Sequence, residues 1–310
     1  MAEVSIGGAV GEGFSLIRKR PGVVLVWGLI YMMATAAVLA LLAPGYIAMF
    51  AAFSQAAAHG APPTLTGPAM QNMMRVQSLT YLYDIFSLLL AAVINCAVFR
   101  AVLHPRQGRW AYLRIGAPEL FLFILIIGAL FCFFIGMVVA MIPIGIVAAI
   151  LAGAHAGAVG AIVGLAGFIA AFVVGIYLSL RVSLVGPMMV DDGKFHLTEA
   201  WALTRGKVAS LFAMALVVFL ILAAAELVIG LILAAIGMGV LSSMAGGLSG
   251  LPALFKQPPQ QLFGKLAPLL ALLAVVWVPL TGCAMAIMGA PWARAYRDLR
   301  PPRDIAETFA

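Results

Sequence analysis

Charged residues are scarce in this chain. Asp, Glu, Lys and Arg make up 9% of its 310 residues, whereas soluble globular domains carry about 25%. Apolar residues make up 65%, and the mean hydropathy is +1.13. This composition excludes a soluble globular domain and predicts an all-α, polytopic membrane protein.

Motifs for common enzyme chemistry are also missing. The sequence has no HExxH or HxxxH pair for zinc, no GxSxG nucleophile elbow and no GxxxxGK[ST] phosphate loop. Its three cysteines, Cys96, Cys132 and Cys283, lie in apolar segments without paired spacing, which argues against a disulfide framework or a metal site. We therefore predict no catalytic residue, no cofactor and no metal.

Six segments are long and apolar enough to cross the hydrocarbon core, which takes about 20 residues of helix. They are the approximate ranges 22–42, 79–99, 120–142, 157–180, 210–236 and 268–291. No charged residue occurs in 120–180, a stretch that is too long for one helix. Since Pro143, Gly145, Gly153 and His155 fall near its centre, we expect two spans joined by a short turn there.

The basic residues predict the orientation of these spans. Arg75, Lys256 and Lys265 fall between spans on one side, and the remaining Lys and Arg, out of 18 in total, fall on the other. Since basic residues in short loops stay in the cytoplasm, both termini are predicted to be cytoplasmic. The intervening segments 43–78 and 237–267 are expected to be outer loops. The net charge of +7 then reflects topology and headgroup contacts instead of nucleic-acid binding.

The first five residues, Met1–Ser5, contain no basic residue, and Arg18, Lys19 and Arg20 precede a first span that ends without an obvious cleavage site. The first span is therefore expected to be an uncleaved helix and not a signal peptide.

An aromatic residue precedes an arginine by four positions three times, and an apolar segment follows each time. The pairs are Phe14 and Arg18, Trp110 and Arg114, and Trp201 and Arg205. Each pair predicts a short amphipathic helix along the cytoplasmic interface. The recurrence predicts one membrane domain, residues 1–310, made of three tandem two-helix repeats. Their approximate bounds are 1–105, 106–190 and 191–300, with a short tail at 301–310.

The even-numbered spans end alike, because an arginine is followed within a few residues by a proline. These pairs are Arg100 with Pro105, Arg181 with Pro187, and Arg297 with Pro301. An arginine at a span end can reach the headgroups, and a proline ends a helix. The predicted interfacial residues are therefore Phe14, Arg18, Arg100, Trp110, Arg114, Arg181, Trp201, Arg205, Arg294 and Arg297.

Two carboxyl groups lie inside predicted spans. Asp84 and Glu226 both fall in the outer half of the bilayer, and Asn95 lies deeper along the span of Asp84. Ionisable groups in a membrane are costly, so a shared cavity used by a transporter or channel is one hypothesis. The alternative is that each carboxyl is protonated, hydrogen-bonded to a neighbouring helix, or near enough to solvent to stay charged.

Acidic residues also lie near predicted helix ends. Glu119 is expected in the first turn of the third span, and Asp191 and Asp192 in a turn. A metal site formed by Asp191, Asp192 and His196 is an alternative, and it would make the chain a membrane enzyme that acts on lipid headgroups.

Residues 181–207 carry a more specific pattern. It consists of Arg181, then Pro187, then Asp191-Asp192-Gly193, then Glu199-Ala200-Trp201-Ala202-Leu203. The pattern resembles the bacterial six-span families grouped with the membrane domain of glycerophosphoryl diester phosphodiesterases and related inner-membrane proteins. The resemblance implies a six-helix inner-membrane domain. We expect no soluble phosphodiesterase barrel within this chain, so the resemblance transfers no catalytic residue.

Together these patterns predict a non-enzymatic integral membrane protein that serves as an accessory, organising or lipid-contacting component. Its expected partners are membrane lipids, with anionic headgroups at the cytoplasmic face foremost, and a membrane-protein partner is a further option. A transporter or channel for a lipid, an amphiphile or a small ion is the first alternative, and a lipid-headgroup enzyme is the second.

Overall fold

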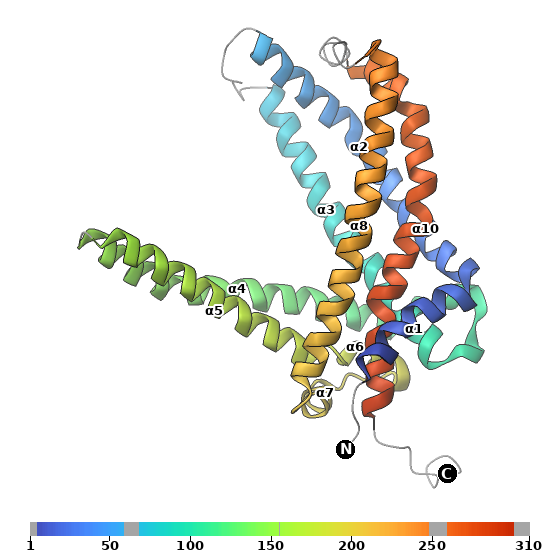
Figure 1. Ribbon diagram of the computed structural model, residues 1–310, viewed down its shortest axis with the longest axis vertical. Coiled ribbons are helices and arrows are strands. Elements are labelled where there is room, and N and C mark those ends of the chain that lie inside the picture. The colour runs from blue at the N-terminus through green and yellow to red at the C-terminus, as the bar shows by residue number, and fades with distance from the viewer. Residues whose placement is uncertain (1–4, 59–67, 155, 248–258, 301–310) are drawn as a thin grey trace. The chain divides into compact units, whose positions relative to one another are not determined.

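The computed structural model describes residues 5–58, 68–154, 156–247 and 259–300, and in these residues it contains helices and no strand. Each of the six long helices contains a window that is apolar and long enough to span a membrane. They are α2 (Pro21–Ala58), α3 (Pro68–Leu103), α4 (Ala117–Gly153), α5 (Gly157–Val182), α8 (Val208–Ala245) and α10 (Pro259–Leu299), labelled in Figure 1. The all-α class and the six apolar helices are thereby confirmed.

Five short elements lie between or before the long helices. They are α1 (Ile6–Lys19), the 3-10 turns η1 (Pro105–Gln107) and η2 (Arg109–Tyr112), α6 (Val185–Asp192) and α7 (Leu197–Leu203). α6 ends at Gly193, whose φ of 74° gives the left-handed conformation that terminates a helix. The chain then turns into α7.

The long helices extend beyond the predicted spans. α2 has 38 residues, or about 57 Å at 1.5 Å per residue, against a hydrocarbon core of about 30 Å. It continues past Leu42 through Pro44 and Gly45, the two residue types least favourable in a helix, and the alanine-rich segment that follows favours helix. The predicted outer loops 43–78 and 237–267 are thus largely helical where they are described, while 59–67 and 248–258 lie outside the described residues.

The uncharged stretch 120–180 forms the hairpin of α4 and α5, as expected, and the two helices run side by side (Figure 1). The break comes after Gly153, so Pro143 and Gly145 lie inside α4. α5 approaches α4 closely at Gly160, where an added Cβ would lie 2.6 Å from the Ala148 carbonyl oxygen. A glycine is needed there, since the opposing atom is backbone.

The three predicted amphipathic helices have different outcomes. Helices form at α1 and α7, and their position along a membrane surface stays a prediction. The segment before the third span forms no α-helix, so that part of the prediction is wrong. Its residues Trp110, Ala111 and Tyr112 have φ values of 51°, 54° and 61°. This costly backbone is held by Tyr112, whose ring is buried and whose hydroxyl donates to the Pro105 carbonyl oxygen at 2.8 Å.

The chain divides into two compact units. Unit 1 comprises Met1–Ser15, Ala92–Val217 and Met288–Ala310, and unit 2 comprises Leu16–Ala91 and Val218–Ile287. In unit 1 most buried residues come from the last turns of α3 and α10, from α6 and from the first turns of α8, where Leu211 and Met214 are fully buried. In unit 2, α2 and α10 touch at Gly28 and Gly282.

Candidate functional site

The polar side chains of unit 1 gather where long helices end and short elements begin. Every ion pair given for the described residues joins two residues of unit 1. We call this set the polar cluster. It consists of Glu12, Arg100, His104, Glu119, Arg181, Asp191, Asp192, His196, Glu199, Thr204, Arg294, Tyr296, Arg297, Asp298 and Arg300.

A buried ion pair joins α3 to α4. Arg100, in the last turn of α3, binds the carboxylate of Glu119 in the first turn of α4. The Glu119 residue is 1% exposed, and Arg100 also donates to the Tyr112 carbonyl oxygen at 3.3 Å. The left-handed backbone of η2 therefore presents an acceptor to the same guanidinium. Because both charges are buried, removing either residue would leave a buried charge without its partner, which would destabilise the fold.

A second arginine joins α5 to α7. The guanidinium carbon of Arg181 lies 4.4 Å from the ring centroid of Trp201, a cation–π contact. Arg181 also donates to the Thr204 hydroxyl at 3.3 Å, and Thr204 is fully buried. That hydroxyl lies within hydrogen-bonding distance of the carbonyl oxygen of Arg181 itself, at 3.2 Å. The end of α5 and the end of α7 are thus held together.

A third set of arginines joins α10 to α1. Arg297 lies 3.5 Å from a carboxylate oxygen of Glu12, and Arg294 lies 3.6 Å from the same oxygen. Arg294 also pairs with Asp298 one turn further along α10. These side chains are partly exposed, so each pair contributes less than the buried pair of Arg100.

Asp191 forms the centre of the polar cluster. Its side chain is nearly buried, and it accepts hydrogen bonds from Arg300 at 2.9 Å and from the Tyr296 hydroxyl at 3.1 Å. His104, which follows α3, places its Nε2 3.3 Å from the other carboxylate oxygen. One carboxylate thereby connects the ends of α3, α6 and α10.

Asp192 points to a different partner. The two ring nitrogens of His196 lie 2.9 Å from carboxylate oxygens of Asp192 and Glu199. Asp192 therefore contacts His196, whereas Asp191 contacts His104 and Arg300, so the three residues Asp191, Asp192 and His196 do not converge on one point. The described ranges contain no group of three or more His, Cys, Asp or Glu side chains placed to hold a metal ion.

The intramembrane residues singled out from the sequence lie in different units. Asp84 in α3 and Glu226 in α8 belong to unit 2 and have exposed side chains. Asn95 belongs to unit 1, where its side-chain oxygen lies against the backbone of α10 at Gly289. No contact given for the described residues joins the two carboxyls, and their shared cavity stays a prediction.

The predicted interfacial residues differ in exposure. Trp201 is exposed, and Arg294 and Arg297 are partly exposed. Phe14, Arg18, Trp110, Arg114 and Arg205 are exposed, and Trp110 reaches 89%. Arg100 and Arg181 are buried and bound to groups of the protein itself, and their contact with headgroups stays a prediction. A carboxylate or an aromatic face within reach stabilises a guanidinium in a dry environment.

The sequence analysis missed several residues of the polar cluster. Glu119 was placed in the first turn of a helix, which is confirmed, but its partner was not foreseen. His104, Thr204, Tyr296 and Arg300 were not singled out. The arginine at the end of each even-numbered span was the available signal, since a cation at such a point needs either a headgroup or a carboxylate.

Comparison of the chain with protein-family models, with curated proteins and with solved structures finds no match.

Proposed function

We propose that this chain is a non-enzymatic integral protein of the bacterial inner membrane. It serves as an accessory or organising component and binds anionic lipid headgroups at its cytoplasmic face. One observation carries the proposal. The arginines that end α3, α5 and α10 each contact the segment that precedes another long helix: Arg100 reaches Tyr112 and Glu119, Arg181 reaches Trp201 and Thr204, and Arg297 reaches Glu12.

This order of contacts supports a three-repeat organisation. The arginine that ends each even-numbered span binds the segment that leads into the next odd-numbered span, and the last arginine returns to the first segment. Three repeats in which each terminal arginine contacts the start of the next repeat would give this order of contacts. The contacts would hold the segments that lead into the odd-numbered spans in place relative to the long helices.

With these arginines bound internally, a different set of arginines is available to lipids. Arg18, Arg114 and Arg205 have exposed side chains, and each follows an exposed aromatic residue by four positions. A basic residue close to an anionic leaflet contributes about 1 kcal/mol of attraction. Exposed aromatic rings suit the depth of the headgroups. The buried polar groups bind one another, which suits a structural role better than a catalytic one.

The proposal is tested by reversing these charges. A variant with Arg18→Glu, Arg114→Glu and Arg205→Glu should retain several-fold less anionic phospholipid after detergent extraction, measured by mass spectrometry of the purified protein. Arg75→Glu is the matched control, because it is an exposed arginine of α3 on the predicted outer side. It should leave the retained anionic lipid unchanged.

Equal retention in the triple variant and in wild type would overturn the headgroup-binding role. Circular dichroism of both proteins checks that the helices are intact. If Arg75→Glu lowers retention in proportion to its one reversed charge against three, the loss follows the total charge of the protein and the proposed face is not its source.

A further inference from the structure

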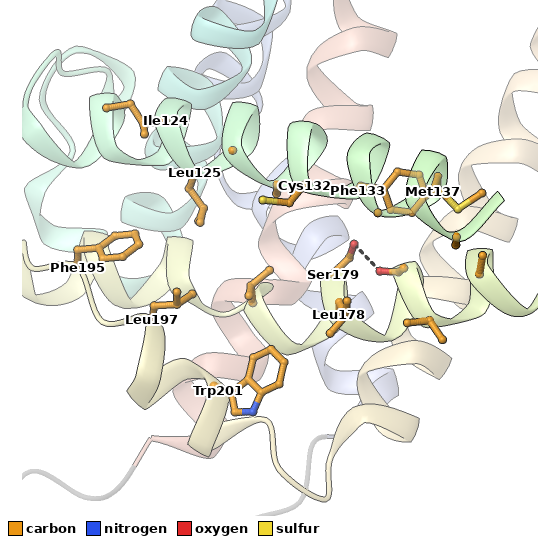
Figure 2. Close-up of a pocket in the computed structure, with 18 of the residues that line it drawn as sticks. Ile124, Leu125, Cys132, Phe133, Met137, Leu178, Ser179, Phe195, Leu197 and Trp201 are labelled. Carbon is orange, nitrogen blue, oxygen red and sulfur yellow. Dashed lines mark hydrogen bonds between the residues drawn. The ribbon is translucent and has the colours of Figure 1, made fainter. Parts of the chain in front are cut away.

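A long apolar groove lies along the hairpin of unit 1. It has a volume of about 850 Å³, and its walls come from α4, from α5 and from the segment around α7. Figure 2 shows Leu125, Cys132 and Phe133 on the α4 wall, Leu178 and Ser179 on the α5 wall, and Phe195 and Trp201 at one end. Sites that hold a single small molecule measure about 300–1,000 Å³.

The chemistry of the walls selects an apolar occupant. Apart from Trp201, the described lining carries aliphatic, aromatic, glycine and cysteine residues, with one hydroxyl, that of Ser179. That hydroxyl donates to the Gly175 carbonyl oxygen at 2.9 Å (Figure 2). A polar solute would therefore lose its hydrogen bonds to water without replacement, whereas a hydrocarbon chain loses nothing.

The length of the groove fits a lipid chain. Its α5 wall extends from Ala171 to Val182, which is about 17 Å at 1.5 Å per residue. One leaflet of the hydrocarbon core is about half of 30 Å. The length of the groove therefore matches the thickness of one leaflet of the hydrocarbon core.

Charge at the Trp201 end favours a negative headgroup. Lys194 directly precedes Phe195, Arg205 follows Trp201 by four positions, and both basic side chains are exposed. The carboxylates of Asp192 and Glu199 lie 2.9 Å from ring nitrogens of His196, and the Arg181 guanidinium over the Trp201 ring adds a third positive charge at this end. Half-exposed aromatic rings at this end suit the boundary between acyl chain and headgroup.

We propose that the groove holds one acyl chain of an anionic phospholipid, with the headgroup phosphate beside Lys194 and Arg205. The proposal rests on the proposed function, which it sharpens from a lipid-facing surface to one defined lipid site. Trp201 stands at the junction, because its ring lines the groove on one side and stacks under the Arg181 guanidinium.

One glycine of α4 allows the groove to be filled without a clash, and another provides a control outside the groove. Gly136 lines the groove, and a Cβ added there meets nothing within 4 Å. Gly145 is on the same helix, has the same open space and does not line the groove. Gly136→Leu therefore fills the groove, and Gly145→Leu is the matched control.

The experiment titrates phosphatidylglycerol onto the delipidated full chain in detergent and counts bound lipids by native mass spectrometry. Wild type and Gly145→Leu should bind one lipid more tightly than the rest, and Gly136→Leu should bind it at least tenfold more weakly. Phosphatidylcholine should bind more weakly than phosphatidylglycerol to wild type. Gly128→Leu, a second open position in the lining, repeats the test if Gly136→Leu does not fold.

Equal lipid binding by Gly136→Leu and Gly145→Leu overturns the groove while leaving the proposed headgroup role intact. The groove is also overturned, and the headgroup role kept, if reversing the charges of Arg18, Arg114 and Arg205 removes the lipid while Gly136→Leu has no effect. If wild type binds neither lipid, both proposals fail. A dimer of wild type that Gly136→Leu abolishes, without a tight lipid, assigns the groove to a second copy of the chain and also overturns the lipid site.

Discussion

The two units of this chain hold their helices together by different means. In unit 1, ion pairs and a cation–π contact join the ends of helices, and several of these charges are buried. In unit 2 the described contacts include the neutral hydrogen bond between Thr35 and Tyr83 and the close approach of Gly28 and Gly282 to opposing backbone.

The difference follows from what each stretch of sequence offers. Helix ends expose carbonyl and amide groups, so charged side chains have backbone partners there as well as one another. Within an apolar span a charge is costly, and helices associate through small residues and neutral hydrogen bonds instead. Unit 1 should therefore be sensitive to changes of charge, and unit 2 to changes of volume.

Breaking the buried ion pair should have the largest effect. Arg100→Met leaves the Glu119 carboxylate buried without its cation, which should lower the free energy of unfolding by about 3–5 kcal/mol. The measurement is an SDS titration in detergent micelles followed by circular dichroism. Arg106→Met, at an exposed arginine of η1, is the control and should cost less than about 0.5 kcal/mol.

The double variant Arg100→Met and Glu119→Met should recover most of the loss, because no charge is then buried alone. If Arg100→Met costs no more than Arg106→Met, the ion pair does not stabilise unit 1, and the contrast between the units disappears.

Adding one methyl group to unit 2 should have an intermediate effect. A Cβ at Gly28 would collide with the Val278 carbonyl oxygen, which belongs to a helix backbone and cannot move aside. Gly28→Ala should therefore cost about 1–3 kcal/mol, measured by thermal unfolding in the same detergent. Gly230→Ala in α8 meets nothing within 4 Å and should leave stability unchanged or slightly raised. Equal stability of the two variants would contradict the close approach of α2 and α10.

Removing a neutral hydrogen bond from unit 2 should have the smallest effect. The Thr35 hydroxyl lies 3.2 Å from the Tyr83 hydroxyl on another helix, so Thr35→Val should cost about 0.6 kcal/mol. Thr80→Val is the control, because the Thr80 hydroxyl donates to Val76 within its own helix. A loss in Thr35→Val as large as that in Arg100→Met would show that polarity matters equally in both units.

The six helices could be predicted because a span requires a long apolar stretch, which a sequence displays directly. Helix ends could not be predicted, since α2 continues beyond Leu42 through Pro44 and Gly45, which usually signal the end of a helix. The failure at Trp110 has a different cause. An aromatic and an arginine at helical spacing were present, but burial of Tyr112 and its bond to Pro105 outweighed the local preference for a helix.

The polar cluster was harder to predict because its partners are distant in sequence. The spacing paired Trp201 with Arg205, whereas the structure pairs it with Arg181 of the preceding long helix. Asp191 and Arg300 lie 109 positions apart, and nothing near either residue indicates the other. A single sequence shows which groups need a partner but does not show which partner the fold supplies.

The contact between Arg297 and Glu12 spans 285 positions, which links it to the order in which the chain is synthesised. At about 5–20 residues per second, a ribosome takes roughly 15–60 s to make the intervening chain. Throughout that interval Glu12 has already been translated while Arg294 and Arg297 have not. Helix α1 is therefore complete well before its partner in α10 exists, and during that time the Glu12 carboxylate lacks the two arginines that it contacts in the folded protein.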